Sequence, residues 1–322
     1  MNLFNLFTRK STSKNVKISI ISNEEWGAYA QAYESMLPVC VQIAGNSIQK
    51  YASSQRLIKN MSSGAPKFCW IYSPYNKFSC HHICFRYMSD VYSIIVAVHG
   101  FTTRNGTTSD KVVVPEYIYN RFLEESEKNN LIPCILPVSI ITRAPMLDGS
   151  HLLNANTQEH ITIEQKESLD QIQMSEWEIN NMGVKIVSDH LEKQGCTIVS
   201  YCDYVGISPQ LWFEKDGKRS YVLVRTVPIG KRDEVYHINK KLLAQYDKYD
   251  GYYAEILASS SSPILQDDKG NFVPLSKRDG KNDVWMWRGD GFYISFTGLQ
   301  EINKAISANS YIKLLDDELY VI

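Results

Sequence analysis

The sequence predicts an α/β protein with two units, and three observations support this fold class. Segments with apolar residues at helical spacing alternate with short apolar strands along the chain. The length of 322 residues allows one large core or two ordinary ones. A polar stretch interrupts the alternation near the middle. We therefore expect an N-terminal α/β domain in residues 1–150, a linker in 151–175, and a second α/β domain in 176–322.

The composition excludes several classes of protein. No run of about 18 apolar residues occurs, so we expect no membrane-spanning segment. In the first ten residues the basic residues follow the apolar patch, which is the reverse of a secretory signal. The seven cysteines lack CxxC spacing, so we expect free thiols and a cytoplasmic protein.

The charge is nearly balanced, with a net value of −1. Residues 1–162 contain 15 Lys and Arg against 11 Asp and Glu, a net charge of +4, which leaves −5 for the remainder. A general basic field typical of nucleic-acid-binding proteins is therefore absent from the sequence, and the first half would meet a polyanion more easily. An offset this small is also typical of ordinary surface variation.

The N-terminal half predicts the order helix, three strands, helix, strand. Pro38 is expected to kink or split the first helix, and a proline near the start suits the second. The expected helices are residues 24–51 and 115–129, and the expected strands are residues 67–72, 78–88, 91–99 and 131–141.

The C-terminal half predicts the same order and then a hairpin and a short helix. The helix at 176–193 has apolar residues at i, i+3, i+4 and i+7 and ends at Gly195. The Asp216-Gly217 dipeptide predicts a hairpin turn between two of the strands. The expected strands are 197–201, 211–214, 221–224 and 252–258, the second helix is 235–246, the late hairpin pairs 284–287 with 292–296, and a helix starts at 300.

The order from Glu176 to Ala258, with a hairpin at its centre, resembles the restriction-endonuclease-like PD-(D/E)XK nuclease superfamily. In that family a Pro-Asp opens the middle strand, and a Glu-x-Lys or Asp-x-Lys ends the next. The carboxylates hold a divalent cation that lowers the pKa of the attacking water. The lysine orients that water and offsets developing charge. The resemblance implies an αβββαβ core in the C-terminal half.

The motif positions in this sequence carry different chemistry. Pro209-Gln210 lies where Pro-Asp is expected, and Leu223-Val224-Arg225 lies where Glu-x-Lys is expected, thirteen residues after Gln210. Gln210 is neutral, Leu223 is apolar, and Arg225 does not deprotonate. A hard cation needs anionic oxygen, and two of the expected donors are missing. The glutamate of the family's first helix corresponds to Glu178.

Two function classes remain open. The first is a catalytically degenerate nuclease-fold protein without a cofactor, which acts as a binding or scaffold module for protein or nucleic acid. Its degenerate motif positions are Glu178, Gln210 and Arg225. The second is a Mg²⁺-dependent nuclease with a relocated site that uses Glu178 and Glu214. Enzymatic activity and oligomeric state both stay open at this point.

The two halves also raise the hypothesis of a tandem of related α/β units. The apolar strands VYSIIVAVHGF and SYVLVRTVP are each introduced by a tyrosine, and each half continues with a helix and a strand. The alternative is that unrelated α/β alternations look alike. A different strand order in the two sheets would contradict the hypothesis.

Three further groups of residues have two interpretations each. Cys80-His81-His82-x-Cys84 offers zinc ligands, but flat strand geometry favours packed or hydrogen-bonded residues. The late aromatic residues, among them Trp285, Trp287 and Tyr293, suit base stacking or a protein interface as well as a half-buried core. The basic residues of the central hairpin suit either phosphate contacts or solvation of a strand end. They are Lys218, Arg219, Arg225, Lys231 and Arg232.

Overall fold

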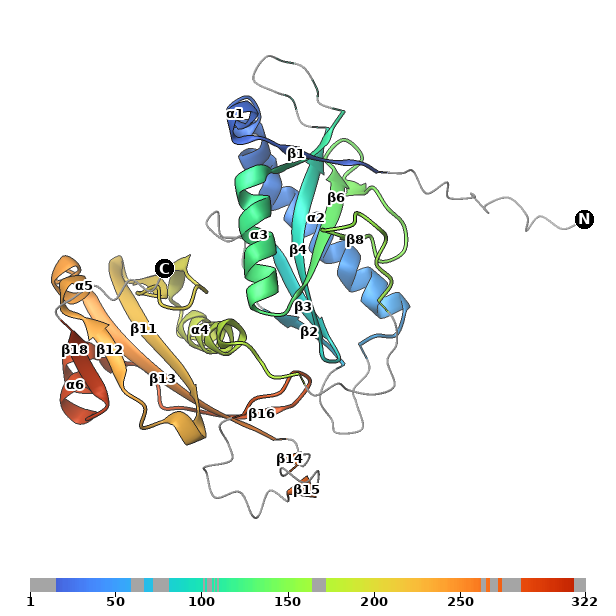
Figure 1. The fold of residues 1–322 in the computed structure, drawn as a ribbon. Helices are drawn as coiled ribbons and strands as arrows, with labels where there is room; N and C mark the ends of the chain where they lie inside the picture. The colour runs from blue at the N-terminus through green and yellow to red at the C-terminus, as the bar shows by residue number, and fades with distance from the viewer. Residues whose placement is uncertain are drawn as a thin grey trace, which may run out of the picture. The chain divides into compact units, whose positions relative to one another are not determined.

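The protein is a mixed α/β protein, as the sequence predicts. The computed structural model describes residues 16–58, 67–71, 81–100, 102, 106, 108, 110–163, 172–261, 265–266, 272–273 and 285–315. The chain divides into two compact units (Figure 1). The first comprises residues 1–58, 80–84 and 91–165, and the second comprises residues 59–79, 85–90 and 166–322.

The first sheet is built around β4 (Asp90–His99). Its strand order is β1 (Ile18–Ile21), β5 (Val112–Pro115), β4, β3 (Ile83–Tyr87) and β2 (Phe68–Ile71), and β6 (Ile132–Ser139) also pairs with β4 in parallel. Residues 91–98 of β4 are all buried, as expected for a strand covered on both faces. The covering helices are α2 (Ala30–Ser54), behind the strands in Figure 1, and α3 (Glu116–Lys128). The short strands β7 (Ala144–Pro145) and β8 (Leu153–Asn154) pair with β6.

The second sheet has the strand order β16-β13-β11-β10-β9. The first three strands in sequence form an antiparallel meander: β9 (Thr197–Tyr201), β10 (Leu211–Lys215) and β11 (Lys218–Pro228). The expected turn at Asp216-Gly217 is present, with φ values of 51° and 75°. β13 (Asp250–Ser260) runs parallel to β11, with Arg225 opposite Glu255, and β16 (Phe292–Phe296) forms the edge beyond β13.

Separate groups of side chains cover the two faces of the second sheet. α4 (Glu176–Lys193) packs Val184, Val187 and Leu191 against one face. The opposite face is covered by residues from β12 (Tyr236–Asn239), α6 (Ile302–Ala308) and β18 (Ile312–Leu315). The strand residues of the first face are Val222, Val224, Ala254 and Ile256, and those of the second are Tyr221, Leu223 and Tyr253. This alternation follows from the two-residue period of a strand.

The expected helix at 235–246 is wrong in its first half. Residues 236–239 form strand β12, and only α5 (Lys240–Gln245) is helical, with Asn239 as its N-cap. β12 pairs in parallel with β18, which lies more than seventy residues further along the chain. Strand pairing over that separation overrides the local helical pattern, because the decisive partner is remote in sequence.

The expected late hairpin is also wrong. β16 pairs with β13, and Trp287 makes an isolated bridge with Gln173. Val284 lies outside the described residues. The remaining short elements are α1 (Asn23–Trp26), η1 (Ile229–Lys231), β14 (Leu265–Gln266), β15 (Phe272–Val273) and β17 (Gln300–Glu301).

The first helical segment is split, but not at Pro38. Pro38 lies inside the continuous helix α2, and the break separating α1 from α2 lies at residues 27–29. In Figure 1, α2 therefore spans the back of the first sheet as one helix.

A core of four strands has the same order in both sheets, β2-β3-β4-β6 in the first and β9-β10-β11-β13 in the second, whereas the strands outside this core differ. In the first, α2 precedes β2, β3 and β4, and α3 leads to β6, which is parallel to β4. In the second, α4 precedes β9, β10 and β11, and α5 leads to β13, which is parallel to β11. No helix in the described ranges is long and apolar enough to cross a membrane.

Candidate functional site

Glu178 lies in the first turn of α4 and is almost completely buried. Its carboxylate accepts a hydrogen bond from the backbone N–H of Ser175 at 2.9 Å, while the Ser175 hydroxyl accepts from the N–H of Glu178, which is a capping box. Arg288 donates from Nε to both carboxylate oxygens at 3.0 Å and from Nη2 to Oε2 at 2.7 Å. Glu178 therefore caps a helix and neutralises a buried arginine.

Gln210 lies immediately before β10, and its side chain supports the neighbouring strand. Its Oε1 accepts a hydrogen bond from the backbone N–H of Val224 at 2.9 Å. Its Nε2 donates to the Ser208 hydroxyl at 3.3 Å. The amide thus satisfies a buried backbone N–H group of β11. A carboxylate at this position could accept the same hydrogen bond, but it would bring a negative charge into the buried site.

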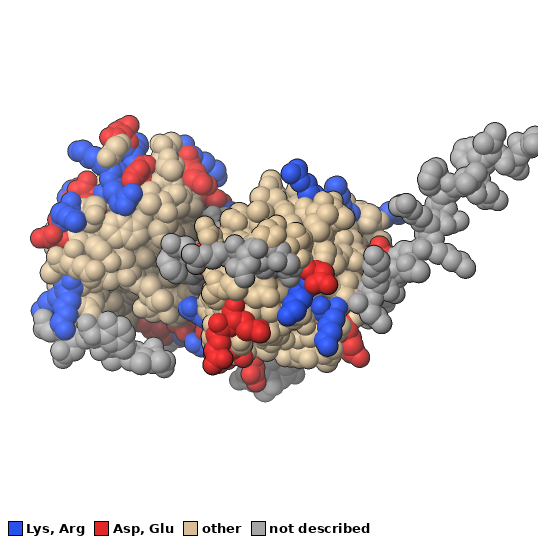
Figure 2. All heavy atoms as spheres, turned by 90° about the horizontal axis from the view of Figure 1, so that it is seen from above, with Lys and Arg blue, Asp and Glu red and all other residues tan. Residues whose placement is uncertain are grey.

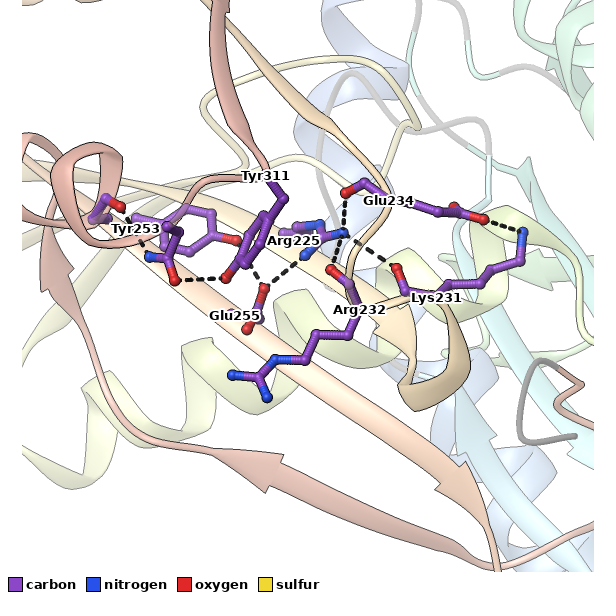
Figure 3. Close-up of polar contacts among 9 residues, drawn as sticks. Arg225, Lys231, Arg232, Glu234, Tyr253, Glu255 and Tyr311 are labelled. Atoms are coloured by element: carbon purple, nitrogen blue, oxygen red, sulfur yellow. Dashed lines mark hydrogen bonds and ion pairs between the residues drawn. The ribbon is translucent and has the colours of Figure 1, made fainter. Parts of the chain in front are cut away.

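Arg225 lies on β11 with a side chain only 4% exposed. Its Nη1 donates to Glu255 Oε1 at 2.7 Å. Its Nη2 donates to the carbonyl oxygens of Arg232 at 2.9 Å, Glu234 at 2.7 Å and Lys231 at 3.4 Å (Figure 3). The guanidinium therefore joins two adjacent strands to the turn that follows β11.

Aromatic residues surround the Arg225–Glu255 pair. The guanidinium carbon of Arg225 lies 4.6 Å from the centre of the Tyr311 ring. The Tyr253 hydroxyl donates to Glu255 Oε1 at 3.2 Å, and the Tyr311 hydroxyl donates to Asn309 Oδ1 at 3.0 Å. Burial raises the pKa of Tyr253, and the adjacent Glu255 carboxylate raises it further. Tyr253 therefore stays a neutral hydrogen-bond donor at ordinary pH.

A polar hollow of about 260 Å³ adjoins this cluster. Residues from β13, the segment after β16 and the end of α6 line it, including Arg232, Tyr253, Glu255, Gln300 and Tyr311. In Figure 3 the Arg232 side chain extends away from Arg225, with its guanidinium free of the buried pair. The hollow therefore presents one exposed guanidinium and one partly buried carboxylate.

The structure gives each sequence-predicted site residue its own partners. Glu178 belongs to the helix that covers one face of the second sheet. Arg225 contacts Tyr236 and Tyr311, which belong to the opposite face. The Gln210 side chain accepts a hydrogen bond from the backbone N–H of Val224 on β11. The arrangement is therefore three separate structural contacts.

Glu214, the other carboxylate of the alternative nuclease site, faces solvent on the central hairpin. It pairs with Arg219 across the turn, at 2.7 Å from Oε1 to Nη2. Within the described ranges, no group of three or more His, Cys, Asp or Glu side chains is arranged to hold a metal ion. Glu178, Glu214 and Glu255 each already hold an arginine, so these residues do not fit a magnesium centre.

His81, His82 and Cys84 are buried in the first sheet, as the packing interpretation predicts. His81 Nδ1 lies 2.6 Å from the Ser93 hydroxyl, and His82 Nδ1 accepts from the N–H of Val96 at 2.9 Å. Burial lowers the pKa of His81 to about 4 and that of His82 to about 3. Cys80 lies outside the described residues.

Sequence reasoning missed Glu255 and Arg288, which are the buried ion-pair partners of Arg225 and Glu178. Glu255 was detectable in principle, because a charged residue inside the apolar run Tyr252 to Ala258 requires a buried partner. Arg288 carries no such signal. Its neighbour Trp287 forms an isolated β-bridge with Gln173. The backbone N–H of Arg288 donates to the carbonyl oxygen of Ile172, and its side chain pairs with Glu178.

Comparison with known protein families gives a match in the second half of the chain. A family described as a domain of unknown function (DUF8840) matches residues 177–302, which is less than half of the chain. No curated protein and no solved structure shows significant similarity to the chain. From α4 to the start of α6, the chain is therefore similar to a family whose description states no function.

Proposed function

We propose that the second unit is a restriction-endonuclease-like core that has lost its metal site and acts as a binding module for a protein partner. The order α4, β9, β10, β11, α5, β13 supports the likeness, together with the antiparallel meander and the parallel β11–β13 pair. The shared order of the four core strands in the two sheets supports the further proposal that the N-terminal half is a related copy.

The observation that carries the loss of catalysis is the environment of Arg225. A catalytic lysine must direct its ammonium at a water beside the metal. Arg225 instead directs its donors at Glu255 and at backbone carbonyls, and its side chain is buried. The motif position has become a structural contact that holds β11, β13 and the following turn together.

The alternative nuclease would have to release its carboxylates from their partners. Freeing Glu178 would break its ion pair with Arg288, a side chain 2% exposed, inside the protein. Freeing Glu214 costs little, because it is exposed, but one carboxylate holds a divalent cation weakly. The geometry therefore favours the binding module.

A protein partner suits the surface of the second unit better than nucleic acid. Three of the five basic residues of the hairpin group are paired within the unit: Arg219 with Glu214, Arg225 with Glu255, and Lys231 with Glu234. Figure 2 likewise shows Lys and Arg interspersed with Asp and Glu on the visible face. Such compensation removes the excess positive charge that binds phosphates.

Exposed apolar side chains mark the candidate protein-binding surface. Tyr293 is 61% exposed and Ile294 is 39% exposed, and both lie on the edge strand β16. Trp285, shortly before this strand, is 48% exposed. Aromatic residues are enriched in protein interfaces, and an edge strand offers backbone groups for pairing.

A titration with Mg²⁺ and Mn²⁺ tests the loss of catalysis. We expect no stoichiometric binding by calorimetry and no cleavage of single- or double-stranded DNA or of RNA. Glu214→Gln is the informative variant, because Glu214 is exposed and its replacement leaves the fold intact. Metal-dependent cleavage that this variant abolishes would establish the relocated nuclease instead.

Cross-linking in cells that contain the protein tests the binding role. We expect a specific cross-linked protein that is lost with Tyr293→Ser and retained with Val199→Ser. Val199 is a matched control, since it is 42% exposed on the opposite edge strand β9. Equal recovery with both variants, or salt-resistant nucleic-acid binding, would contradict the proposal.

The described cysteines support a cytoplasmic location as part of the same proposal. Six of the seven are described, and all six are free thiols. Cys40, Cys84, Cys134 and Cys196 are buried. Buried free thiols are typical of reducing compartments.

A further inference from the structure

The first unit contains a surface hollow of about 530 Å³, separate from the residues considered above. One wall is the C-terminal half of α2, and the other is the segment from Arg143 to His151, which includes β7. The residues on which the argument depends are Ile43, Lys50, Tyr51, Arg143, Pro145 and His151.

The hollow carries only basic ionisable groups apart from Tyr51. Lys50, Arg143 and His151 line it, and none of its described lining residues is Asp or Glu. This composition differs from the hairpin group of the second unit, in which three of the five basic residues are paired with acidic side chains. Unopposed positive charge around a concave surface raises the local concentration of anions. Arg143 adds a planar fork of donors that matches phosphate oxygens.

The backbone at Arg143 and His151 has an unusual conformation and is held by hydrogen bonds. Arg143 has a φ of 51° and His151 a φ of 64°, both in the left-handed region that residues other than glycine rarely adopt. Backbone hydrogen bonds from Ile140 to His99 and from Met146 to Pro137 fix the segment at 3.0 and 2.9 Å. The His151 Nδ1 lies 2.5 Å from the Leu147 carbonyl oxygen. Strained positions that persist in a fixed segment are concentrated at binding sites.

The walls of the hollow combine apolar residues with the polar residues Asn46, Ser47 and Ser54. Ile43 and Tyr51 from α2 face Pro145 and its neighbour Ala144 from β7. A bare inorganic anion gains nothing from these apolar residues, whereas a flat organic ring buries apolar area against them. The volume lies within the range of small-molecule sites.

We propose that this hollow binds a small organic phosphate with a flat ring, which is the chemistry of a nucleotide. Lys50, Arg143 and His151 contact the phosphates, and Tyr51 and Pro145 contact the ring. The site does not depend on the proposed function of the second unit, because the two share no residue.

Calorimetry with the full chain in about 0.15 M salt tests the ligand class. The probes are ADP, GDP and UDP, with adenosine and pyrophosphate as the two halves of a ligand. We expect at least one diphosphate to saturate a single site. We expect adenosine and pyrophosphate each to bind at least about tenfold more weakly, because each lacks one set of contacts.

Two variants test the residues without disturbing the backbone. Arg143→Gly and His151→Asn remove the guanidinium and the imidazole and replace these residues with ones that tolerate positive φ. We expect each to weaken binding about tenfold while circular dichroism and thermal midpoint stay unchanged. Lys17→Ala, which removes an exposed lysine of the same unit, is the control and should bind normally.

Four outcomes would overturn the proposal. The first is that none of the three diphosphates shows saturable binding at millimolar concentration, and the second is that both variants bind as the native chain does. The third is that pyrophosphate binds as tightly as the nucleotides. The fourth is that a single-stranded oligonucleotide displaces the nucleotide at a lower concentration. The last would assign the hollow to nucleic acid.

Discussion

Arg225 and Glu178 show at the residue scale what burial demands of a charge. Each lies at a position where the nuclease resemblance expects a catalytic group, and each is less than 5% exposed. An isolated buried charge is costly, so both are paired and hydrogen-bonded. The Arg225 guanidinium satisfies more acceptors than a lysine could, which explains why arginine suits this position.

Replacing Arg225 should destabilise the second unit strongly. Arg225→Met removes the guanidinium that pairs with Glu255 and donates to three carbonyl groups, so we expect a loss of about 3–5 kcal/mol in the free energy of unfolding. Arg225→Lys should lose less, because it keeps the charge opposite Glu255. Urea unfolding followed by circular dichroism measures both.

The exposed pair on the same hairpin provides the control. Arg219→Met breaks the contact with Glu214, whose side chain is 41% exposed, and should cost less than about 1 kcal/mol. If Arg225→Met cost no more than Arg219→Met, the structural role assigned to Arg225 would be wrong.

The buried histidines should make the first unit sensitive to acid. The pKa of His81 is about 4 and that of His82 about 3, both below the value of about 6.5 in an unfolded chain. At a pH between the native and the unfolded pKa values, the unfolded chain binds protons that the native chain does not. The free energy of unfolding therefore falls as the pH is lowered. We expect a loss of about 2 kcal/mol per histidine from pH 7 to pH 5.

His82→Asn tests the assignment of this pH dependence. The asparagine amide oxygen still accepts from the N–H of Val96 but does not titrate. Urea unfolding of the variant at pH 7 and pH 5 should show about half the pH dependence of the native chain. An unchanged dependence would place the titrating groups elsewhere.

At the scale of elements, the packing of α4 on β11 depends on one glycine. A Cβ added to Gly183 would lie 1.7 Å from Oγ1 of Thr226 and 2.8 Å from its Cβ. Gly183→Ala should therefore destabilise the protein by about 1–3 kcal/mol, even though alanine favours helices. Thermal and urea unfolding measure the change.

A second substitution gives this prediction its control. Thr226→Ala removes the hydroxyl and methyl groups nearest to Gly183. The double variant should recover part of the stability that Gly183→Ala loses. Strictly additive effects would show that close approach at Gly183 is not the cause.

Long continuous patterns made some elements predictable and others not. α4 was predicted at its observed bounds because its apolar face and its capping residues are local. β12 was mistaken for helix and β1 and β5 were not expected, because each is stabilised by a strand far away in sequence. The hairpin of β10 and β11 was predicted because its turn is encoded by two adjacent residues.

At the scale of the whole molecule, the chain has two compact units, and β4 and β6 lie mainly in the first while β11 and β13 lie in the second. We expect the backbone amides of these two pairs of strands to differ in how their hydrogen-exchange protection responds to a substitution. Arg225→Met should lower hydrogen-exchange protection in β11 and β13 and leave β4 and β6 unchanged. Transfer to pH 5 should affect β4 and β6 first. Equal loss across both sheets would indicate one cooperative unit.

The sequence by itself determined the α/β class, the central hairpin, the helix at 176–193 and the absence of acidic residues at two nuclease positions. These properties depend on residue type and on neighbours within a few positions. The tertiary structure alone decided that Arg225 meets Glu255, that Glu178 meets Arg288, and that Lys50 and Arg143 share a hollow. Each of these pairings joins residues 30 or more positions apart, and a buried or concave arrangement exists only once the strands and helices have packed.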